Sequence, residues 1–304
     1  MSIMKASVSR RFFVCFNTLF MILISLACLL PFLHVLWASF SLPSELQIHN
    51  GLLLWPIGFN LEGYKIVFGK DTLMSGYQVT LFVTFAGTFL SMLLSCFGAY
   101  VLSKRDLLLN KLFLRLITIT MFVSGGMIPS YLLVDSIGLN GSLWALILPY
   151  CMNTWNMMVM RAAFRTLPES LEESARIDGA QELTILFKIV IPLSIPVMAV
   201  MVMFYALNYW NSWFPASLYI RKRNLYPLQL LMREILMMDE ASLNSSLGTS
   251  AEINSMGNDE VGAQNYVELL KYTTIVVSTL PIIMVYPFLQ KYFVKGILVG
   301  SLKE

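Results

Sequence analysis

The sequence predicts an all-α membrane protein with six transmembrane helices. Of its 304 residues, 57% are hydrophobic and only 13% are charged, whereas about 25% of the residues of a soluble domain are charged. Six segments of at least 19 residues contain no Asp, Glu, Lys or Arg, and a helix needs about 20 mostly apolar residues to cross a bilayer. The charge-free segments are 12–44, 72–103, 116–134, 136–160, 189–220 and 272–290.

Each charge-free segment is long enough for one span. The first is predicted to be retained rather than cleaved as a signal peptide, because its apolar run 12–36 is much longer than the roughly 7–15 apolar residues of a signal sequence. A shorter charge-free stretch, 46–61, contains Gly, Pro, Asn and His and is predicted to be an extracytoplasmic loop. The predicted spans are 13–36, 78–103, 112–133, 142–162, 188–210 and 271–291.

The basic residues predict the orientation. With the N-terminus inside, 14 of the 21 Lys and Arg residues fall in cytoplasmic segments, which agrees with the positive-inside rule. Both termini and the connection 167–187 are therefore predicted to be cytoplasmic. The net charge of +3 follows from this topology, and no nucleic-acid partner is predicted.

Several function classes lack their residues in this sequence. There is no HExxH motif, no G-x-S-x-G motif and no pair of intramembrane carboxylates, so neither a catalytic residue nor a metal site is predicted. The four cysteines all fall in predicted spans without a CxxC pair and are expected to be free thiols. An ion-coupled secondary transporter would place acidic or basic groups inside its spans, which makes it the less favoured rival class.

The third extracytoplasmic loop, 214–270, is predicted to be large. After Pro227 its apolar residues recur with helical spacing, which predicts an amphipathic helix outside the membrane. This helix either packs on the ends of the spans or also forms part of a docking surface. Its apolar residues are Leu228, Leu231, Met232, Ile235 and Leu236.

An acidic segment lies between the fourth and fifth predicted spans. Thr166 and Glu169 have capping-box spacing around Pro168, which predicts that a helix begins here. It is expected to end at Gly179, and a second helix from about Ala180 leads into the fifth span. A solvated amphipathic linker remains the alternative at this point. One face of the first helix is expected to be small and nearly flat, suited to a cleft, and is formed by Leu171, Ser174, Ala175 and Asp178.

The spacing within this segment resembles the EAA signature of permease subunits of bacterial ABC importers. The signature places E-A-A three residues before Gly, and nine further residues lead to I-x-L-P. This chain has Glu173-Ser174-Ala175, then Gly179, then Ile189-x-Ile191-Pro192. It departs from the signature by Ser at position 174 and Ile at position 191. The stretch LEESARIDGA is similar to the carbohydrate-uptake branch that includes the maltose importer, and WFPASLYIRKRNLYPLQLLMREIL resembles permeases for complex oligosaccharides and polysaccharide fragments.

The resemblance implies a binding-protein-dependent ABC importer permease (MetI-like) fold. Its core would cover 73–292, after an N-terminal helix and loop in 1–72 and before a cytoplasmic tail in 293–304. Coupling helices at about 167–188 would be seated in a partner ATPase and would drive alternating access. The implied ATPase-coupling residues are Glu172, Glu173, Ser174, Ala175, Asp178, Gly179, Ile189 and Pro192.

The resemblance also implies an assembly in the bacterial cell membrane. Its members would be a homologous permease subunit, two copies of a cytoplasmic ATPase that bind ATP and Mg²⁺, and an extracytoplasmic solute-binding protein. The chain itself has no complete phosphate-binding loop of the form G-x-x-x-x-G-K-[ST], so it is expected to be neither an enzyme nor a cofactor-binding subunit.

An oligosaccharide is the substrate that the resemblance implies, and a peptide or amino acid is the alternative. Aromatic rings are candidates for the substrate path because sugars stack their C–H faces on rings, although rings in a membrane protein also serve packing and the interfacial belt. The candidate residues are Tyr150, Trp155, Tyr205, Tyr209, Trp210 and Trp213.

Overall fold

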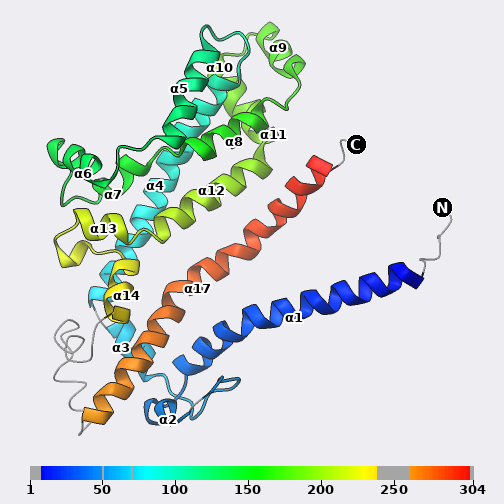
Figure 1. The fold of residues 1–304 in the computed structure, drawn as a ribbon. Coiled ribbons are helices and arrows are strands. Elements are labelled where there is room, and N and C mark those ends of the chain that lie inside the picture. The colour runs from blue at the N-terminus through cyan, green and yellow to red at the C-terminus, as the bar shows by residue number, and fades with distance from the viewer. Residues whose placement is uncertain (1–7, 50, 70, 238–259, 302–304) are drawn as a thin grey trace. The chain divides into compact units, whose positions relative to one another are not determined.

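The protein is helical throughout its regular structure. The computed structural model describes residues 8–49, 51–69, 71–237 and 260–301, where the helices are joined by loops and one isolated β-bridge (Figure 1). The chain forms two compact units. Unit 1 combines residues 1–70 with 235–279, and unit 2 combines 71–234 with 280–304. The prediction of an all-α fold is confirmed.

Unit 1 contains the first predicted span. Helix α1 (Val8–Ser39) exposes almost all of its apolar side chains between Phe12 and Phe32, as a helix in contact with lipid does. Two short helices, α2 (Pro43–Ile48) and α3 (Glu62–Gly69), follow it.

A small apolar core closes unit 1 at the end of α1. Ala38, Leu46 and Leu53 are buried there. His34 Nδ1 accepts a hydrogen bond of 3.1 Å from the backbone N–H of Leu53, and the hydroxyls of Ser39 and Tyr64 lie 2.7 Å apart. His34 therefore holds the loop after α1 in place.

Unit 2 is built around one long helix, α4 (Asp71–Ser103), against which α8 (Thr154–Phe164) and α12 (Ile195–Trp210) pack. Gly87, Ser91 and Ser95 recur every four residues on α4, and we call them the small-residue face. Small residues at this spacing allow membrane helices to approach closely.

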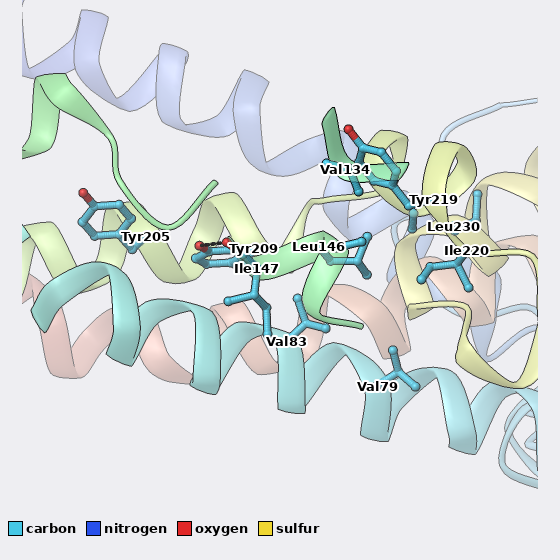
Figure 2. Close-up of a cluster of buried hydrophobic side chains, with 12 residues drawn as sticks. Val79, Val83, Val134, Leu146, Ile147, Tyr205, Tyr209, Tyr219, Ile220 and Leu230 are labelled. Atoms are coloured by element: carbon cyan, nitrogen blue, oxygen red, sulfur yellow. Dashed lines mark hydrogen bonds between the residues drawn. The ribbon is translucent and has the colours of Figure 1, made fainter. Parts of the chain in front are cut away.

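Two tyrosines of α12 fill the small-residue face. The Tyr209 hydroxyl lies 3.0 Å from Ser91 Oγ, and the Tyr205 hydroxyl lies 2.6 Å from Ser95 Oγ. Both rings are buried. Figure 2 shows them on the same helix, with Tyr209 beside Ile147, whose carbonyl accepts a hydrogen bond of 3.3 Å from the Tyr209 hydroxyl. These bonds satisfy polar groups that neither lipid nor apolar side chains could solvate.

Three single helices among the described residues are long and apolar enough to cross a membrane. They cover 9–39, 71–103 and 267–285, which agrees with the first, second and sixth predicted spans. The last lies within α17 (Glu260–Ser301), which continues past the predicted start of the tail at 293. Two bent helix pairs pass the same test as pairs, which gives up to five spans in the described part of the chain.

The third and fifth spans are bent, and the sequence places Pro129 and Pro196, which predict kinks, close to these two bends. The third consists of α5 (Asn110–Phe122) and α6 (Met127–Ser136), bent by 111° at a break that contains two glycines.

In the fifth span, residues 182–193 meet α12 at 89° around Ser194. Pro192 and Pro196 flank this bend, and each lacks the N–H that a continuous helix would use. The first arm contains α10 (Glu182–Ile185), the π-helical turn η2 (Leu186–Val190) and α11 (Ile191–Leu193).

The fourth predicted span is not one helix either. Helix α7 (Trp144–Ile147) and the 3₁₀ turn η1 (Leu148–Tyr150) precede α8, and residues 151–153 between them are non-helical. Asn153 caps α8 by accepting a hydrogen bond of 3.0 Å from the backbone N–H of Asn156. Pro149 and this cap divide the segment, although it has no charged residue before Arg161.

The predicted outer helix is present as α14 (Leu228–Met237), after the shorter elements α13 (Phe214–Tyr219) and η3 (Arg223–Leu225). Its first backbone N–H, at Leu228, donates a hydrogen bond of 2.8 Å to Thr80 Oγ1 of α4. The part of the predicted loop at 238–259 lies outside the described residues.

We expect replacement of Gly87 by Ala to destabilise unit 2. A β-carbon at this position would lie 2.7–2.8 Å from the ring of Tyr209, and overpacking of this kind costs about 1–3 kcal/mol. Thermal unfolding of the purified protein in detergent should therefore show a lower midpoint. Gly125→Ala is the matched control, because its nearest contact would be 3.8 Å away. Equal midpoints for the two variants would contradict the packing described here.

Candidate functional site

The acidic segment predicted from the sequence forms a helix, α9 (Glu169–Ile177), outside the charge-free segments. The predicted capping box is wrong. Pro168 itself is the N-cap, with an extended backbone conformation, and Thr166 Oγ1 instead donates a hydrogen bond of 2.7 Å to the carbonyl of Ala163. Pro168 can occupy the N-cap position, one residue before the first helical turn, because its fixed φ is compatible with that position. It has no backbone N–H that would need a hydrogen-bond partner there.

The end of α9 agrees with the prediction. Gly179 has a φ of +80°, which side chains with a β-carbon rarely adopt. The N–H of Gly179 donates to the carbonyl of Arg176 at 3.0 Å, and the N–H of Ala180 donates to the carbonyl of Ala175 at 2.9 Å. These two bonds form a Schellman motif, so the helix ends in a tight turn that leads directly into α10.

Charged side chains connect α9 to the end of α4. Lys104 follows the last residue of α4, and its ammonium group forms an ion pair with Glu172 of α9. It also lies 3.2 Å from Oε2 of Glu182 at the start of α10. A second ion pair joins Arg105 and Glu169, with 2.6 Å between Nε and Oε1.

Glu182 has two further partners. The Tyr100 hydroxyl donates a hydrogen bond of 2.5 Å to Oε2, and Arg176 donates from Nε and Nη2 to Oε1 at 3.1 and 2.8 Å. Hydrogen bonding by Tyr100 and the positive charges of Lys104 and Arg176 hold the pKa of the Glu182 carboxyl below its usual range. We call Tyr100, Lys104, Glu172, Arg176 and Glu182 the Lys104 cluster.

The opposite face of α9 is exposed. Glu173 and Ser174 are exposed, and Ile177 is 87% exposed. Ala175, by contrast, is partly buried against an apolar cluster. The predicted face of small residues is therefore divided between the two sides of the helix. Glu173 also lines a cavity of about 120 Å³ between α9 and the end of α4.

The remaining predicted coupling residues follow the turn. Asp178 is the C-cap of α9. Ile189 lies in the π-helical turn η2 and packs partly against the same apolar cluster as Ala175, whereas Pro192 is exposed in α11 before the bend.

Sequence reasoning missed Ile177 and Lys104. The signal for Ile177 was a large apolar side chain in an otherwise polar segment. Lys104 could be singled out only as the first basic residue after a span, because its partner Glu172 is 68 residues away in the sequence.

A second candidate site lies at the C-terminal end of α12. A cavity of about 210 Å³, which we call the aromatic cavity, is lined by three of the six predicted substrate-path residues: Tyr150, Tyr209 and Trp213. The amide side chains of Asn208 and Asn211 contribute polar groups to its wall. Rings with a few polar groups are typical of a small-ligand pocket.

The other three predicted rings lie outside this cavity. Trp155 is 62% exposed on α8. Tyr205 is fully buried and bonded to Ser95, and Trp210 is buried with its ring edge-on to Tyr77.

A basic side chain lies over one ring of the aromatic cavity. The Arg233 guanidinium of α14 lies 3.9 Å from the centroid of the Trp213 ring. No described carboxylate forms an ion pair with Arg233, whereas the nearby Arg223 pairs with Glu234 at 3.5 Å. Arg233 thus places a positive charge beside Trp213.

The described residues contain no group of three His, Cys, Asp or Glu side chains that could hold a metal ion. The four cysteines are free.

Comparison with known proteins identifies the family. The model of the "Binding-protein-dependent transport system inner membrane component" family matches residues 3–299. The chain belongs to this family. Members are multi-pass membrane components, so the predicted MetI-like fold and the membrane location are confirmed.

Similar members of this family carry transport names. The chain is 42% identical to the "Polygalacturonan/rhamnogalacturonan transport system permease protein YtcP" of Bacillus subtilis (strain 168), over 93% of this chain and 96% of the relative. It is 39% identical to "Protein LplC" of the same organism, over 97% and 95%. Because the similar relatives include permease subunits, the expectation that this family member is not itself an enzyme is confirmed.

A solved structure shares the fold. It is a "bacterial ABC transporter involved in the import of the acidic polysaccharide alginate", and one of its chains superimposes with a TM-score of 0.82 at 29% identity. The match covers 95% of this chain and 99% of that chain. The bent spans and α9 therefore belong to a chain that matches an importer subunit along nearly its whole length.

Proposed function

We propose that this chain is the permease subunit of an ATP-driven importer and forms half of the translocation path for an oligosaccharide or polysaccharide fragment. The observation that carries the proposal is α9: a polar helix between two spans, closed by Gly179, in a chain of the binding-protein-dependent transport family. Transport of polygalacturonan or rhamnogalacturonan by one relative and of alginate by another supports a saccharide over the peptide or amino-acid alternative.

The assembly that we propose contains a homologous permease subunit and two copies of a cytoplasmic ATPase, which bind ATP and Mg²⁺. An extracytoplasmic binding protein delivers the saccharide. Both termini and α9 are cytoplasmic in this arrangement, in keeping with the distribution of Lys and Arg.

The exposed face of α9 meets the ATPase. Glu173 offers a carboxylate to a basic group of the partner, and Ile177 offers an apolar side chain to a groove. An apolar anchor with a polar rim is the usual composition of a binding hot spot. When the ATPase closes on ATP it displaces α9, and the differential contact with its two states drives alternating access.

We expect Glu173→Lys to abolish ATP-dependent uptake in proteoliposomes that contain the complete importer, because it reverses the charge at the ATPase contact. Gly179→Val should do the same, since Val is strained at a φ of +80° and the turn after α9 would change. Gly179→Asn is the matched control, because Asn tolerates this conformation, and it should retain uptake. Normal uptake by both Glu173→Lys and Gly179→Val, with membrane insertion verified, would rule out coupling through α9.

The aromatic cavity favours an acidic saccharide. Its rings can stack on the C–H faces of a sugar, and Asn208 and Asn211 can bond to hydroxyls. Arg233 adds a positive charge over Trp213 that a uronate carboxylate can pair with. Both the alginate importer and the polygalacturonan relative carry saccharides built from uronic acids.

Arg233→Gln should reduce uptake of a galacturonate trisaccharide about fivefold, which corresponds to the loss of about 1 kcal/mol from a partly exposed ion pair. Uptake of a neutral trisaccharide, if the importer carries one, should be unchanged. Arg221→Gln provides the control, because Arg221 is an exposed cation of the same loop. Saccharide uptake that is insensitive to Arg233→Gln would remove the acidic-saccharide assignment and leave the importer assignment intact.

A further inference from the structure

We propose that Lys104 is a positioning residue that transmits the movement of α9 directly to α4, through the two carboxylates that converge on it. The proposal rests on the proposed function, in which α9 is displaced by an ATPase. It concerns residues whose identity the signature does not specify: Tyr100 and Lys104 at the end of α4, and Glu182 at the start of α10.

The carboxylates come from both sides of the turn at Gly179. Glu172 precedes the turn in α9 and Glu182 follows it in α10, and both pair with the Lys104 ammonium. Arg176 closes the arrangement by bonding Glu182 from α9. The whole turn is thus held as one unit against a single point of α4.

The central ion pair is shielded from water. The side chains of Lys104 and Glu172 are only 19% and 20% exposed, whereas the neighbouring pair of Arg105 and Glu169 is 64% and 59% exposed. The ammonium also lies 4.2 Å from the centroid of the Tyr100 ring. Coulomb attraction weakens with solvent exposure, so the Lys104 cluster ties α9 to α4 more strongly than the outer pair does.

Few other contacts hold α9. No residue of α9 is buried, and the connection to α8 consists of the short non-helical stretch 165–168. Ala175 packs partly against the apolar cluster. Loss of Lys104 would leave two carboxylates close together without their shared cation, and α9 would move independently of α4.

The end of α4 beside Lys104 is held by hydrogen bonds from other parts of unit 2. The side chain of Asn110 donates to the carbonyl of Lys104 at 2.6 Å, and Arg161 Nε donates to the carbonyl of Leu102 at 2.8 Å. Further along, α4 contacts Tyr205 and Tyr209 of α12 through Ser95 and Ser91. Because Tyr209 also lines the aromatic cavity, a displacement applied at Lys104 reaches the cavity through contacting, hydrogen-bonded helices.

The test compares Lys104→Met with Arg105→Met in the complete importer, reconstituted in proteoliposomes. The measured quantity is the number of ATP molecules hydrolysed per saccharide transported. Changes along a coupling network alter coupling by about 0.5–2 kcal/mol, which is about a two- to thirtyfold change. Lys104→Met should raise the ratio by this factor while ATP hydrolysis continues, and Arg105→Met should leave it within twofold.

Glu182→Gln is the second variant, because its side chain is 55% exposed and its replacement leaves folding intact even if Lys104→Met fails to insert. Glu182→Gln should also raise the number of ATP molecules hydrolysed per saccharide transported. The double variant Lys104→Met/Glu182→Gln should show a smaller effect than the sum of the two single effects, since both substitutions disrupt the same attachment of α9 to α4.

Two outcomes overturn the proposal: an unchanged ratio in both Lys104→Met and Glu182→Gln, or strictly additive effects of the two changes. Failure of the proposed function is a different result, because the wild-type importer would then show no ATP-dependent uptake at all.

Discussion

The junction at Lys104 joins a polar helix to an apolar one. Helix α9 carries charges that water or a protein partner must solvate, and α4 has no charged residue after Asp71. The two can move together only if strong, directional contacts bridge them. Ion pairs at Lys104 provide such contacts at the point where the apolar helix ends, and they do so with little exposure to water. The Arg105–Glu169 pair and the packing of Ala175 are other contacts of α9, and both are more exposed or less directional.

Helix α4 contributes to both functional sites. One end carries the Lys104 cluster, and the small-residue face receives Tyr205 and Tyr209 from α12. Tyr209 also lines the aromatic cavity, so its replacement would disturb packing and the cavity together, whereas Tyr205 contributes to packing through its hydrogen bond to Ser95. A permease must transmit displacement without opening a void between its helices, and close contacts between small residues and rings satisfy this requirement.

The sequence was sufficient for the features that depend on local chemistry. Charge-free length located α1, α4 and the apolar part of α17. Gly179 located the end of α9, because few other residues adopt its conformation at low cost. Hydropathy could not reveal the bends at Ser194 and between α5 and α6, since it counts apolar residues and is insensitive to where a helix is interrupted. Hydropathy does not reveal the division of 142–162 for the same reason, although Pro149 predicts a kink there.

Non-local contacts were beyond sequence reasoning. Tyr205 was one of the candidates for the substrate path, with packing as the alternative, and its hydrogen bond to Ser95, 110 residues away, accounts for its position inside the protein. Glu172 was grouped with Glu173 as an ATPase contact, and the structure gives it an internal partner in Lys104. Adjacent residues on a helix point in different directions, so the two glutamates have different surroundings despite their identical chemistry.

The most direct measurement of the central claim is site-specific photocrosslinking from position 177 in the assembled importer. A photoreactive phenylalanine analogue in place of Ile177, which is 87% exposed on α9, should form a covalent product with the ATPase subunit on illumination. The same analogue at Leu23, on the apolar surface of α1, should not. An intact assembly that yields no ATPase product from position 177 would contradict transmission of force through α9.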